Sequence, residues 1–384
     1  MQKRLHLVLL AALSLNAASR ADQAVAPVLQ PFVEQQILAG AVTLVADKDK
    51  VLDVTTVGYA DVAAQDAMSA DDLFWIASMS KPITGAAFMI LVDEGKVSVD
   101  DPVEKYLPEF KGQMVAEKGG TKEKPTTGAP HAPNHPILIR NVLSHTSGLP
   151  FKSPMEQPTL DQQPLAARVS SYAKLQLEFE PDTKYQYSNA GINTAGRIIE
   201  VVSGMSFEDF LQKRLLEPCG MKDTTFWPDE AQLKRIAKAY KASEDKSGIE
   251  ETHVAQLRYP LNDHAHRFPM PAGGLFSTAA DCAKFCQMLL HGGTLNGKRI
   301  LSEEAVKQMT SKQTAPGVEN SYGFGFATGG GTFGHGGAYS TNMTADPKSG
   351  LITVFMVQNA GWRSDEGKKI DGMFREAALK LFAK

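Results

Sequence analysis

The tetrapeptide Ser78-Met79-Ser80-Lys81 places a hydroxyl and an amine three residues apart. On a helix this spacing puts both side chains on one face, with the lysine amine within reach of the serine oxygen. A serine becomes a nucleophile when a neighbour accepts its proton, and lysine does so only if burial or nearby cations lower its pKa. The pattern predicts acyl transfer with Ser78 as nucleophile and Lys81 as base. Taken alone, it is also the pattern of an exposed pair on an ordinary helix.

A second chemical group lies in the segment Tyr185 to Gly191, where Tyr187 precedes Asn189 by two residues. If the phenol lies near Ser78, it can take up the serine proton or deliver one to the leaving group, depending on whether Tyr187 or Lys81 is ionised. The Asn189 amide can bind a substrate carbonyl or hold the lysine. An aromatic turn on a loop is the alternative interpretation of this segment.

The third candidate is the run His335-Gly336-Gly337-Ala338. Glycines allow a substrate to lie close to a strand edge, so His335, Gly336 and Gly337 are candidate substrate-binding residues. The amide of Ala338 can pair with that of Ser78 to form an oxyanion hole. A glycine-rich hairpin with a surface histidine has the same sequence pattern.

The nucleophile must be positioned by a helix that follows it. Apolar residues recur at helical spacing from Ile83 to Leu91, which predicts a long amphipathic helix opened by Ser78. Pro82 suits the first turn, where an amide has no helical partner, and Glu94-Gly95 is a stop signal.

The two ends of the chain show alternating helix and strand patterns, whereas the middle is mainly helical. We therefore predict one domain over residues 22–384, with an α/β part from 22–77 and 291–384 and a helical part from 78–290. Lys111 to Pro136 reads as a surface loop. The predicted elements of the α/β part are a helix over 28–38, strands over 41–46, 51–57 and 351–357, and a helix over 370–382.

Residues 1–21 have the pattern of a signal peptide. Lys3-Arg4 precedes an apolar run from Leu5 to Leu15, and Ser19-Arg20-Ala21 resembles a cleavage site. The run is too short to span a bilayer and no other segment is long enough, so we expect no stable membrane insertion. The sequence predicts export to the periplasm or out of the cell.

Composition narrows the partners of the protein. The formal net charge of -3 over 384 residues provides no basic field for nucleic acid, so a small-molecule substrate is expected. No oligomeric state follows from the sequence. The three cysteines do not indicate a disulfide framework, and Cys282 and Cys286 fall on the buried stripe of a predicted helix. Zinc binding by these two cysteines and His291 lacks the usual ligand spacing, so no metal is expected.

Other residues match weak ligand patterns. The pairs His131 with His135 and His264 with His266 lie in proline-containing loops, where solvated side chains are expected. Gly329, Gly331 and Gly334 have dinucleotide-loop spacing without the required strand and helix. No cofactor is predicted.

Together the three chemical segments resemble the serine β-lactamase and penicillin-binding-protein superfamily, in the branch of class C β-lactamases, D-aminopeptidases, D,D-peptidases and family VIII carboxylesterases. Ser78 to Lys81 resembles the first motif, Tyr187 to Asn189 the second, and His335 to Gly337 stands in place of Lys-Thr-Gly. The segments Leu143 to Leu149 and Ala272 to Thr278 are also similar to family stretches. The resemblance implies an α/β (α+β) fold in which an antiparallel sheet is flanked by helices, with an inserted helical region.

The third motif departs from the β-lactamase pattern. Histidine and glycine offer a carboxylate less charge and one hydroxyl fewer than lysine and threonine. Family members with His or Trp here include peptidases and esterases. We expect a secreted serine hydrolase for small acyl esters, with D-residue amides or peptides second and β-lactams third. A catalytically silent binding protein of the same fold is the alternative outside enzymes.

His335 also leads to an expectation about pH. At a cleft edge it should titrate near its ordinary pKa of about 6.5, so carboxylate-bearing substrates should bind more strongly as pH falls.

Overall fold

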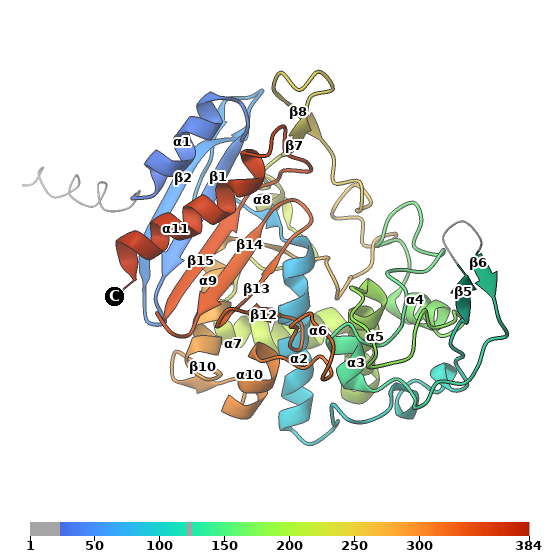
Figure 1. Cartoon of the computed structure of the whole chain (residues 1–384). Coiled ribbons are helices and arrows are strands. Elements are labelled where there is room, and N and C mark those ends of the chain that lie inside the picture. Colours follow the sequence, from blue (N-terminus) through green and yellow to red (C-terminus); the bar gives the residue numbers. More distant parts are fainter. Residues whose placement is uncertain (1–23, 121–124, 384) are drawn as a thin grey trace, which may run out of the picture.

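The two ends of the chain meet in one antiparallel sheet of seven strands, in the order β12-β13-β14-β15-β1-β2-β3 (Figure 1). The computed structural model describes residues 24–120 and 125–383, so the predicted signal segment, 1–21, lies outside the described residues. The strands are β1 (Gly40–Ala46), β2 (Val51–Asp61), β3 (Asp66–Ala67), β12 (Ala327–Gly329), β13 (Thr332–Gly336), β14 (Asn342–Asp346) and β15 (Leu351–Met356). The predicted antiparallel sheet is confirmed.

The centre of the sheet is covered on both faces. Every residue of β1 and β15 is buried, as expected for strands with near-continuous apolar sequences. Helices α1 (Ala26–Glu34) and α11 (Ile370–Phe382) pack on one face, and α9 (Ala279–Leu290) packs on the other. The antiparallel pairing of Val42 with Met356 joins the two ends of the chain.

Two of the predicted elements end several residues from the predicted position, whereas β1 and β15 differ from the prediction by one residue. Helix α1 ends at Glu34 instead of residue 38, because Gln36 has a φ of 54° and the amides of Ile37 and Leu38 donate back to Phe32 O. Strand β2 continues to Asp61 instead of ending at residue 57, because its last residues pair with β3. Helix α11 has the predicted bounds.

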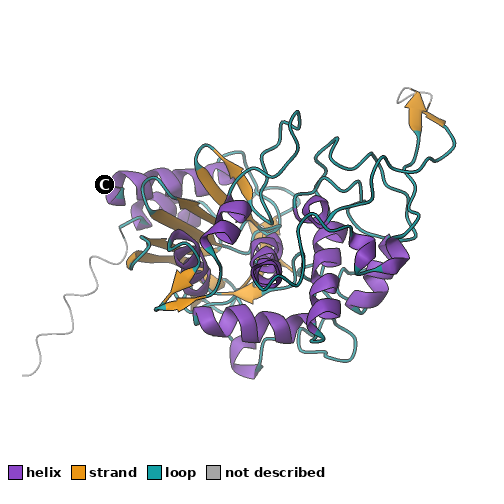
Figure 2. Cartoon of the chain, turned by 90° about the horizontal axis from the view of Figure 1, so that it is seen from below, coloured by secondary structure: helices purple, strands orange, loops and turns teal. Residues whose placement is uncertain are grey.

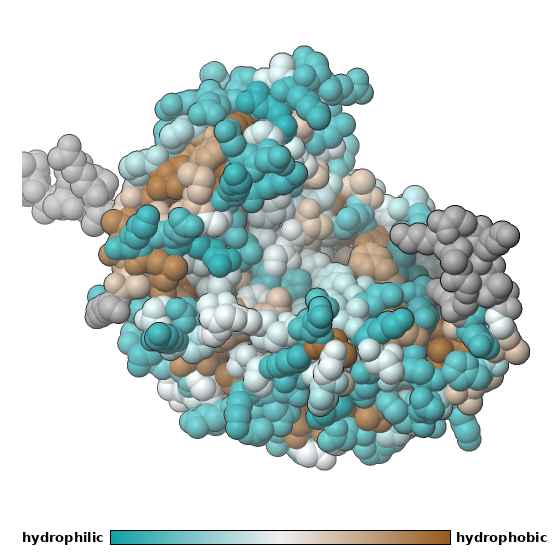
Figure 3. Space-filling model, in the orientation of Figure 1, coloured by the Kyte–Doolittle hydropathy of each residue, from teal (hydrophilic) through white to brown (hydrophobic). Residues whose placement is uncertain are grey.

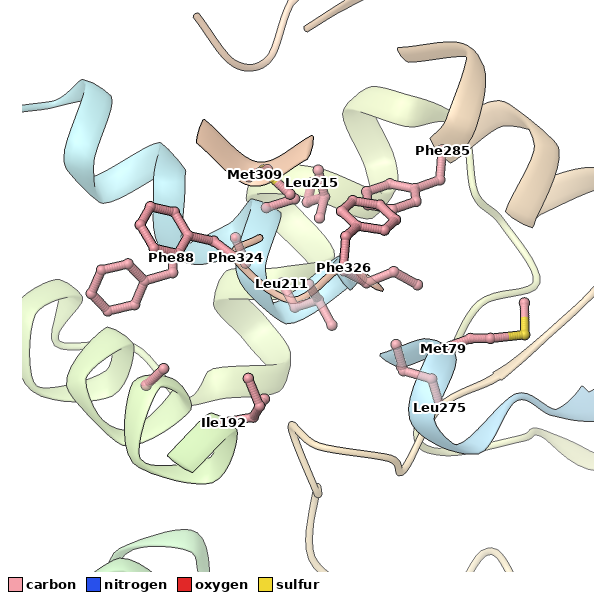
Figure 4. Packing of buried hydrophobic residues seen from close by; sticks show 14 of the residues in the cluster. Met79, Phe88, Ile192, Leu211, Leu215, Leu275, Phe285, Met309, Phe324 and Phe326 are labelled. Atoms are coloured by element: carbon pink, nitrogen blue, oxygen red, sulfur yellow. The ribbon is translucent and has the colours of Figure 1, made fainter. Parts of the chain in front are cut away.

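Helix α2 (Ser80–Asp93) lies between the sheet and a group of helices. Figure 2 distinguishes these helices from the strands by colour. Its residues from Ser80 to Leu91 are all buried, so it is enclosed on every side and is not amphipathic as predicted. Figure 4 shows Phe324, Phe326 and Leu211 among the apolar side chains that pack near it. The helices beyond it are α3 (Ile139–Leu143), α4 (Leu165–Tyr172), α5 (Asn189–Ser203), α6 (Phe207–Leu211), α7 (Glu217–Cys219) and α10 (Glu303–Thr310), with a π-helical turn at Gln212–Leu216.

The predicted helical region, 78–290, is not purely helical. Its last helix, α9, belongs to the sheet side, and the loop predicted over residues 111–136 contains a small hairpin. The remaining short elements are β4 (Phe74–Trp75), β5 (Lys118–Gly120), β6 (Pro125–Thr127), β7 (Ala239–Ala242), β8 (Ile249–Thr252), β9 (Phe276–Ser277), β10 (Thr294–Leu295), β11 (Lys298–Arg299) and α8 (Glu230–Leu233), with 3₁₀ turns at Ala77–Met79, Val103–Lys105, Pro108–Phe110 and Gly367–Lys369.

Close packing against α2 gives a stability prediction at Gly85. An added Cβ would lie 2.5 Å from the backbone oxygen of Phe324, so Gly85→Ala should lower the free energy of unfolding by about 1 to 3 kcal/mol. Gly372 in α11 is the matched control, because nothing lies within 4 Å of its added Cβ. Gly372→Ala should raise stability by about 0.5 to 1 kcal/mol. Urea denaturation of both variants tests this, and equal effects would contradict it.

Candidate active site

Ser78 lies on a tight turn between β4 and α2. The turn is a 3₁₀ helix, Ala77–Met79, so Ser78 precedes α2 by two residues and does not open it as predicted. Ala77 has a φ of 45°, a strained conformation for a residue with a Cβ. The amide of Ile76 donates to Leu275 O at 3.0 Å and anchors the turn to the β9 side. Ser78 itself is half-buried.

Lys81 is fully buried directly below this serine. Its Nζ donates to Ala272 O at 2.7 Å and to Asn189 Oδ1 at 2.8 Å, and it lies 3.2 Å from Ser78 Oγ. Burial holds the pKa of the Lys81 amine well below its ordinary value of 10.5. The carbonyl and the amide oxygen can only accept hydrogen bonds, whereas the serine hydroxyl can give up a proton. Of the three contacts, only the one to Ser78 could therefore carry a proton to Lys81.

The two acceptors around Lys81 are themselves fixed. Asn189 begins α5, whose first turn is capped by Ser188, and the amide of Ala272 donates to Asn193 Oδ1 at 3.1 Å. Thr84 in α2 donates to the neighbouring Pro271 O at 2.7 Å. Of the two roles predicted for the Asn189 amide, holding Lys81 is the one seen. The sequence analysis assigned no role to Ala272 and noted its segment only because it resembles a family stretch. A contact made by a backbone carbonyl does not depend on residue type, so the sequence could not reveal it.

Tyr187 lies beside both groups, with its ring centroid 4.6 Å from Lys81 Nζ. Burial raises the pKa of the Tyr187 phenol, and the neighbouring Ser78 hydroxyl opposes this only in part. The pKa of the phenol is therefore raised while that of the lysine amine is lowered. These opposite directions favour Lys81 as proton acceptor and Tyr187 as proton donor, among the roles left open by the sequence.

The end of β13 lies against the turn that carries Ser78. Thr341 Oγ1 donates to Ile76 O at 3.4 Å and Gly337 N donates to Thr341 O at 2.7 Å. Within residues 24–120 and 125–383, no hydrogen bond from the amide of Ser78 or of Ala338 to another protein group is found. Two amides without partners on adjoining segments are what an oxyanion hole requires. Figure 3 shows the molecular face hollowed in the middle, where Figure 1 places the start of α2.

His335 does not behave as predicted. Its side chain is only 8% exposed, its Nδ1 lies 2.7 Å from Gly336 O and its Nε2 lies 2.9 Å from the Tyr322 hydroxyl. Burial, together with the nearby Lys81, lowers the pKa of His335 to about 3. The expected titration near neutrality is therefore wrong, and His335 carries no charge at neutral pH. The sequence could not reveal Tyr322 as its partner.

Two aromatic residues of this region were assigned no role from the sequence. The ring centroid of His145 lies 4.5 Å from that of Tyr187 and 4.6 Å from that of Tyr322. The only available signal was that His145 belongs to one of the segments that resemble the family. Its neighbours come from distant parts of the chain.

The other ligand patterns do not form sites. Cys282 and Cys286 are buried in the core, whereas His291 pairs with Asp49 at 3.1 Å. Gly329 and Gly334 lie in paired strands of a hairpin. No group of three metal-ligating side chains occurs in the described part of the chain. The loop histidines have other contacts: His131 with Glu180, His135 with Asp182, His266 with Asp263, and His264 with the Trp227 ring.

Among the described residues, no helix is long and apolar enough to cross a membrane.

If Lys81 accepts the serine proton, the effect of a conservative change can be predicted. Lys81→Arg should lower kcat/KM on a nitrophenyl ester by at least about 100-fold, nearly as much as Lys81→Ala, because a guanidinium stays protonated. Lys241→Arg, at an exposed lysine paired with Glu250, is the control and should change little. Retention of most activity by Lys81→Arg would instead assign the base to Tyr187.

Adjacent glycines in the third motif give a matched pair. A Cβ on Gly337 would lie 2.6 Å from Ile76 O and would also meet Thr341, whereas nothing lies closer than 3.6 Å to a Cβ on Gly336. Gly337→Ala should therefore displace β13 from the Ser78 turn and lower kcat/KM by about 100-fold. Gly336→Ala should keep activity within a few-fold. Similar kinetics for both variants would contradict the close approach.

Comparison with known proteins gives the relationships of the chain. The family model described as "Beta-lactamase" matches residues 25–377. Protein Rv1367c of Mycobacterium tuberculosis is 33% identical over 361 residues, covering 84% of this chain and 86% of that protein. Esterase EstB of Burkholderia gladioli is 26% identical over 388 residues, covering 91% and 93%.

A solved structure shows the same fold. EstCE1, described as a hydrolase with promiscuous acyltransferase activity, aligns with a TM-score of 0.74 at 23% identity, covering 92% of this chain and 97% of the other. The expected resemblance and fold are thus confirmed. The chain belongs to the β-lactamase family and has the β-lactamase and transpeptidase fold of serine hydrolases.

Proposed function

We propose that this protein is a serine ester hydrolase that works through an acyl-enzyme. Ser78 Oγ attacks the ester carbonyl as its proton moves to Lys81, and the amides of Ser78 and Ala338 stabilise the oxyanion. The tetrahedral intermediate then expels the alkoxide, which takes a proton from Tyr187, and Lys81 passes the serine proton on to the phenolate so that both groups are restored. In deacylation water attacks the acyl carbonyl and gives a proton to Lys81, the Ser78 oxygen leaves with a proton from Tyr187, and transfer from Lys81 to Tyr187 completes the cycle as the carboxylic acid is released. The buried amine beside Ser78 supports this over a catalytically silent binding protein, because an unused buried lysine would only cost stability.

The substrate class is proposed to be small carboxylic esters without a carboxylate next to the reacting group. The observation that carries this is His335, whose two ring nitrogens are engaged by Gly336 and Tyr322 and which remains uncharged at neutral pH. Gly336 contributes no hydroxyl beside it. Penicillins and peptides ending in a free carboxylate therefore lack a cationic partner at this position. Neutral esters need no cationic partner, so ester hydrolysis is the first choice. D,D-peptidase or D-aminopeptidase activity and class C-like β-lactamase activity are the alternatives.

Export remains a proposal on the pattern of residues 1–21. Location in the periplasm or outside the cell would put the enzyme in contact with esters before they reach the cytoplasm. Cell fractionation with an N-terminal sequence of the mature protein tests it. A mature chain that begins near residue 22 in the exported fraction is the expected result, and an uncleaved chain in the cytoplasm contradicts it.

The function is tested by side-by-side rates on nitrophenyl esters, D-amino acid nitroanilides and a chromogenic cephalosporin. We expect the esters to be hydrolysed fastest. Ser78→Ala should lower kcat/KM on these esters by at least about 1,000-fold while the protein stays folded. A neutral ester and its carboxylate-bearing analogue should keep the same ratio of kcat/KM, within about twofold, from about pH 5 to about pH 8. A ratio that shifts toward the carboxylate as pH falls would show that His335 titrates and contacts substrate.

A further inference from the structure

His145 accepts hydrogen bonds from the residues on both sides of Tyr187. Its backbone oxygen accepts a hydrogen bond from the amide of Gln186 at 2.9 Å, and its ring Nδ1 accepts one from the amide of Ser188 at 3.1 Å. The residue is 1% exposed and has a φ of 62°. This strained backbone conformation lets one residue present both acceptors to the tyrosine segment.

The same residue also contacts the phenol ring. The His145 ring centroid lies 4.5 Å from that of Tyr187, inclined by 44°, and Phe151 stacks with Tyr187 at 6.3 Å. The ring of Tyr322 lies 4.6 Å from His145 at 60°, which closes the other side of the histidine. Tyr187 is therefore fixed through its two neighbouring amides and through its ring.

The contacts also determine the tautomer of His145. A backbone amide can only donate, so Nδ1 must hold a lone pair and the proton of the neutral ring must lie on Nε2. Nε2 is buried and has no hydrogen-bond partner among the described residues. The ring thus acts through Nδ1 as an acceptor and not as a proton shuttle.

The hydrogen bonds of His145 also connect it to the surroundings of Lys81. The amide of Ser188 donates to His145, and the Ser188 side chain caps α5. Its Oγ accepts a hydrogen bond from Gly191 N at 3.1 Å. Asn189, the next residue, holds Lys81 Nζ. One histidine thereby connects the segment that carries the proton donor to the helix start that fixes the base.

We propose that His145 is a positioning residue for Tyr187: its carbonyl and Nδ1 hold the amides flanking the tyrosine, and its ring holds the phenol, so that the hydroxyl stays directed at the leaving-group oxygen. This inference rests on the proposed acyl-transfer function. It predicts that His145 matters most for leaving groups that must receive a proton as they depart.

Two amide substitutions separate the acceptor position from general damage. Asn places an oxygen where His145 has Nδ1, and it tolerates a positive φ. Gln places its oxygen further out, near the position of Nε2. His145→Asn therefore keeps the acceptor toward Ser188, whereas His145→Gln displaces it, and both variants lose the ring.

The measurement is kcat/KM on a methyl ester and a 4-nitrophenyl ester of the same acyl group. Nitrophenolate leaves without a proton, whereas methoxide requires one. The fraction of folded protein multiplies both values equally, so the ratio of nitrophenyl to methyl rates is unaffected by lost stability. We expect His145→Gln to raise this ratio at least about tenfold, as Tyr187→Phe should, and His145→Asn to stay within about threefold of the parent.

A double variant completes the test. If His145 acts through Tyr187, adding His145→Gln to Tyr187→Phe should leave the ratio unchanged. Equal ratios in the parent and in both His145 variants would overturn the proposal, as would a further rise in the double variant. Labelling of Ser78 by a fluorophosphonate, whose fluoride needs no phenolic proton, distinguishes the failures. If the parent is labelled at Ser78 and hydrolyses esters, a flat ratio refutes only the role of His145; an unlabelled and inactive parent refutes the proposed function.

Discussion

The burial of the Lys81 amine is the constraint on which the site depends. A lysine enclosed in the protein loses its water, and the charged form loses most. Oxygen atoms of Ser78, Asn189 and Ala272 contact the amine in its place, and these belong to three separate parts of the chain. The environment that favours a neutral amine beside Ser78 therefore exists only while α2, the start of α5 and the segment before β9 are packed together. Folding itself creates this environment.

That dependence explains why α2 is enclosed on all sides. A helix with a solvent face would let water reach the lysine and restore its charge. Instead α5, α6, α10 and the sheet side surround it, and Gly85 allows the Phe324 backbone to approach closely. The contacts that stabilise α2 are thus the ones that keep water from Lys81.

The sequence predicted the local features well. The grouping of Ser78, Lys81 and Tyr187 was predicted from residue type, spacing and the family resemblance, and the structure brings the three together. The strands were predicted from short apolar runs between turn residues. It failed where environment comes from distant segments. A period of apolar residues does not tell a buried helix from an amphipathic one when small residues such as Thr84 and Gly85 occupy the remaining positions. The neutral state of His335 depends on Tyr322, and the hydrogen bond of His145 Nδ1 depends on Ser188, neither of which adjoins its partner in the sequence.

The pairing of β1 with β15 has a consequence for synthesis of the chain. Val42 pairs with Met356, and the turn that carries Ser78 lies against Gly337 and Thr341. The polypeptide therefore leaves the ribosome with Ser78 early and with the segment that packs against it late. Contacts over such separations form slowly, because the long intervening chain must close first. A nascent or truncated polypeptide therefore has a serine and a lysine but no assembled centre. The surroundings of Ser78 are complete only after the last strands have joined the sheet.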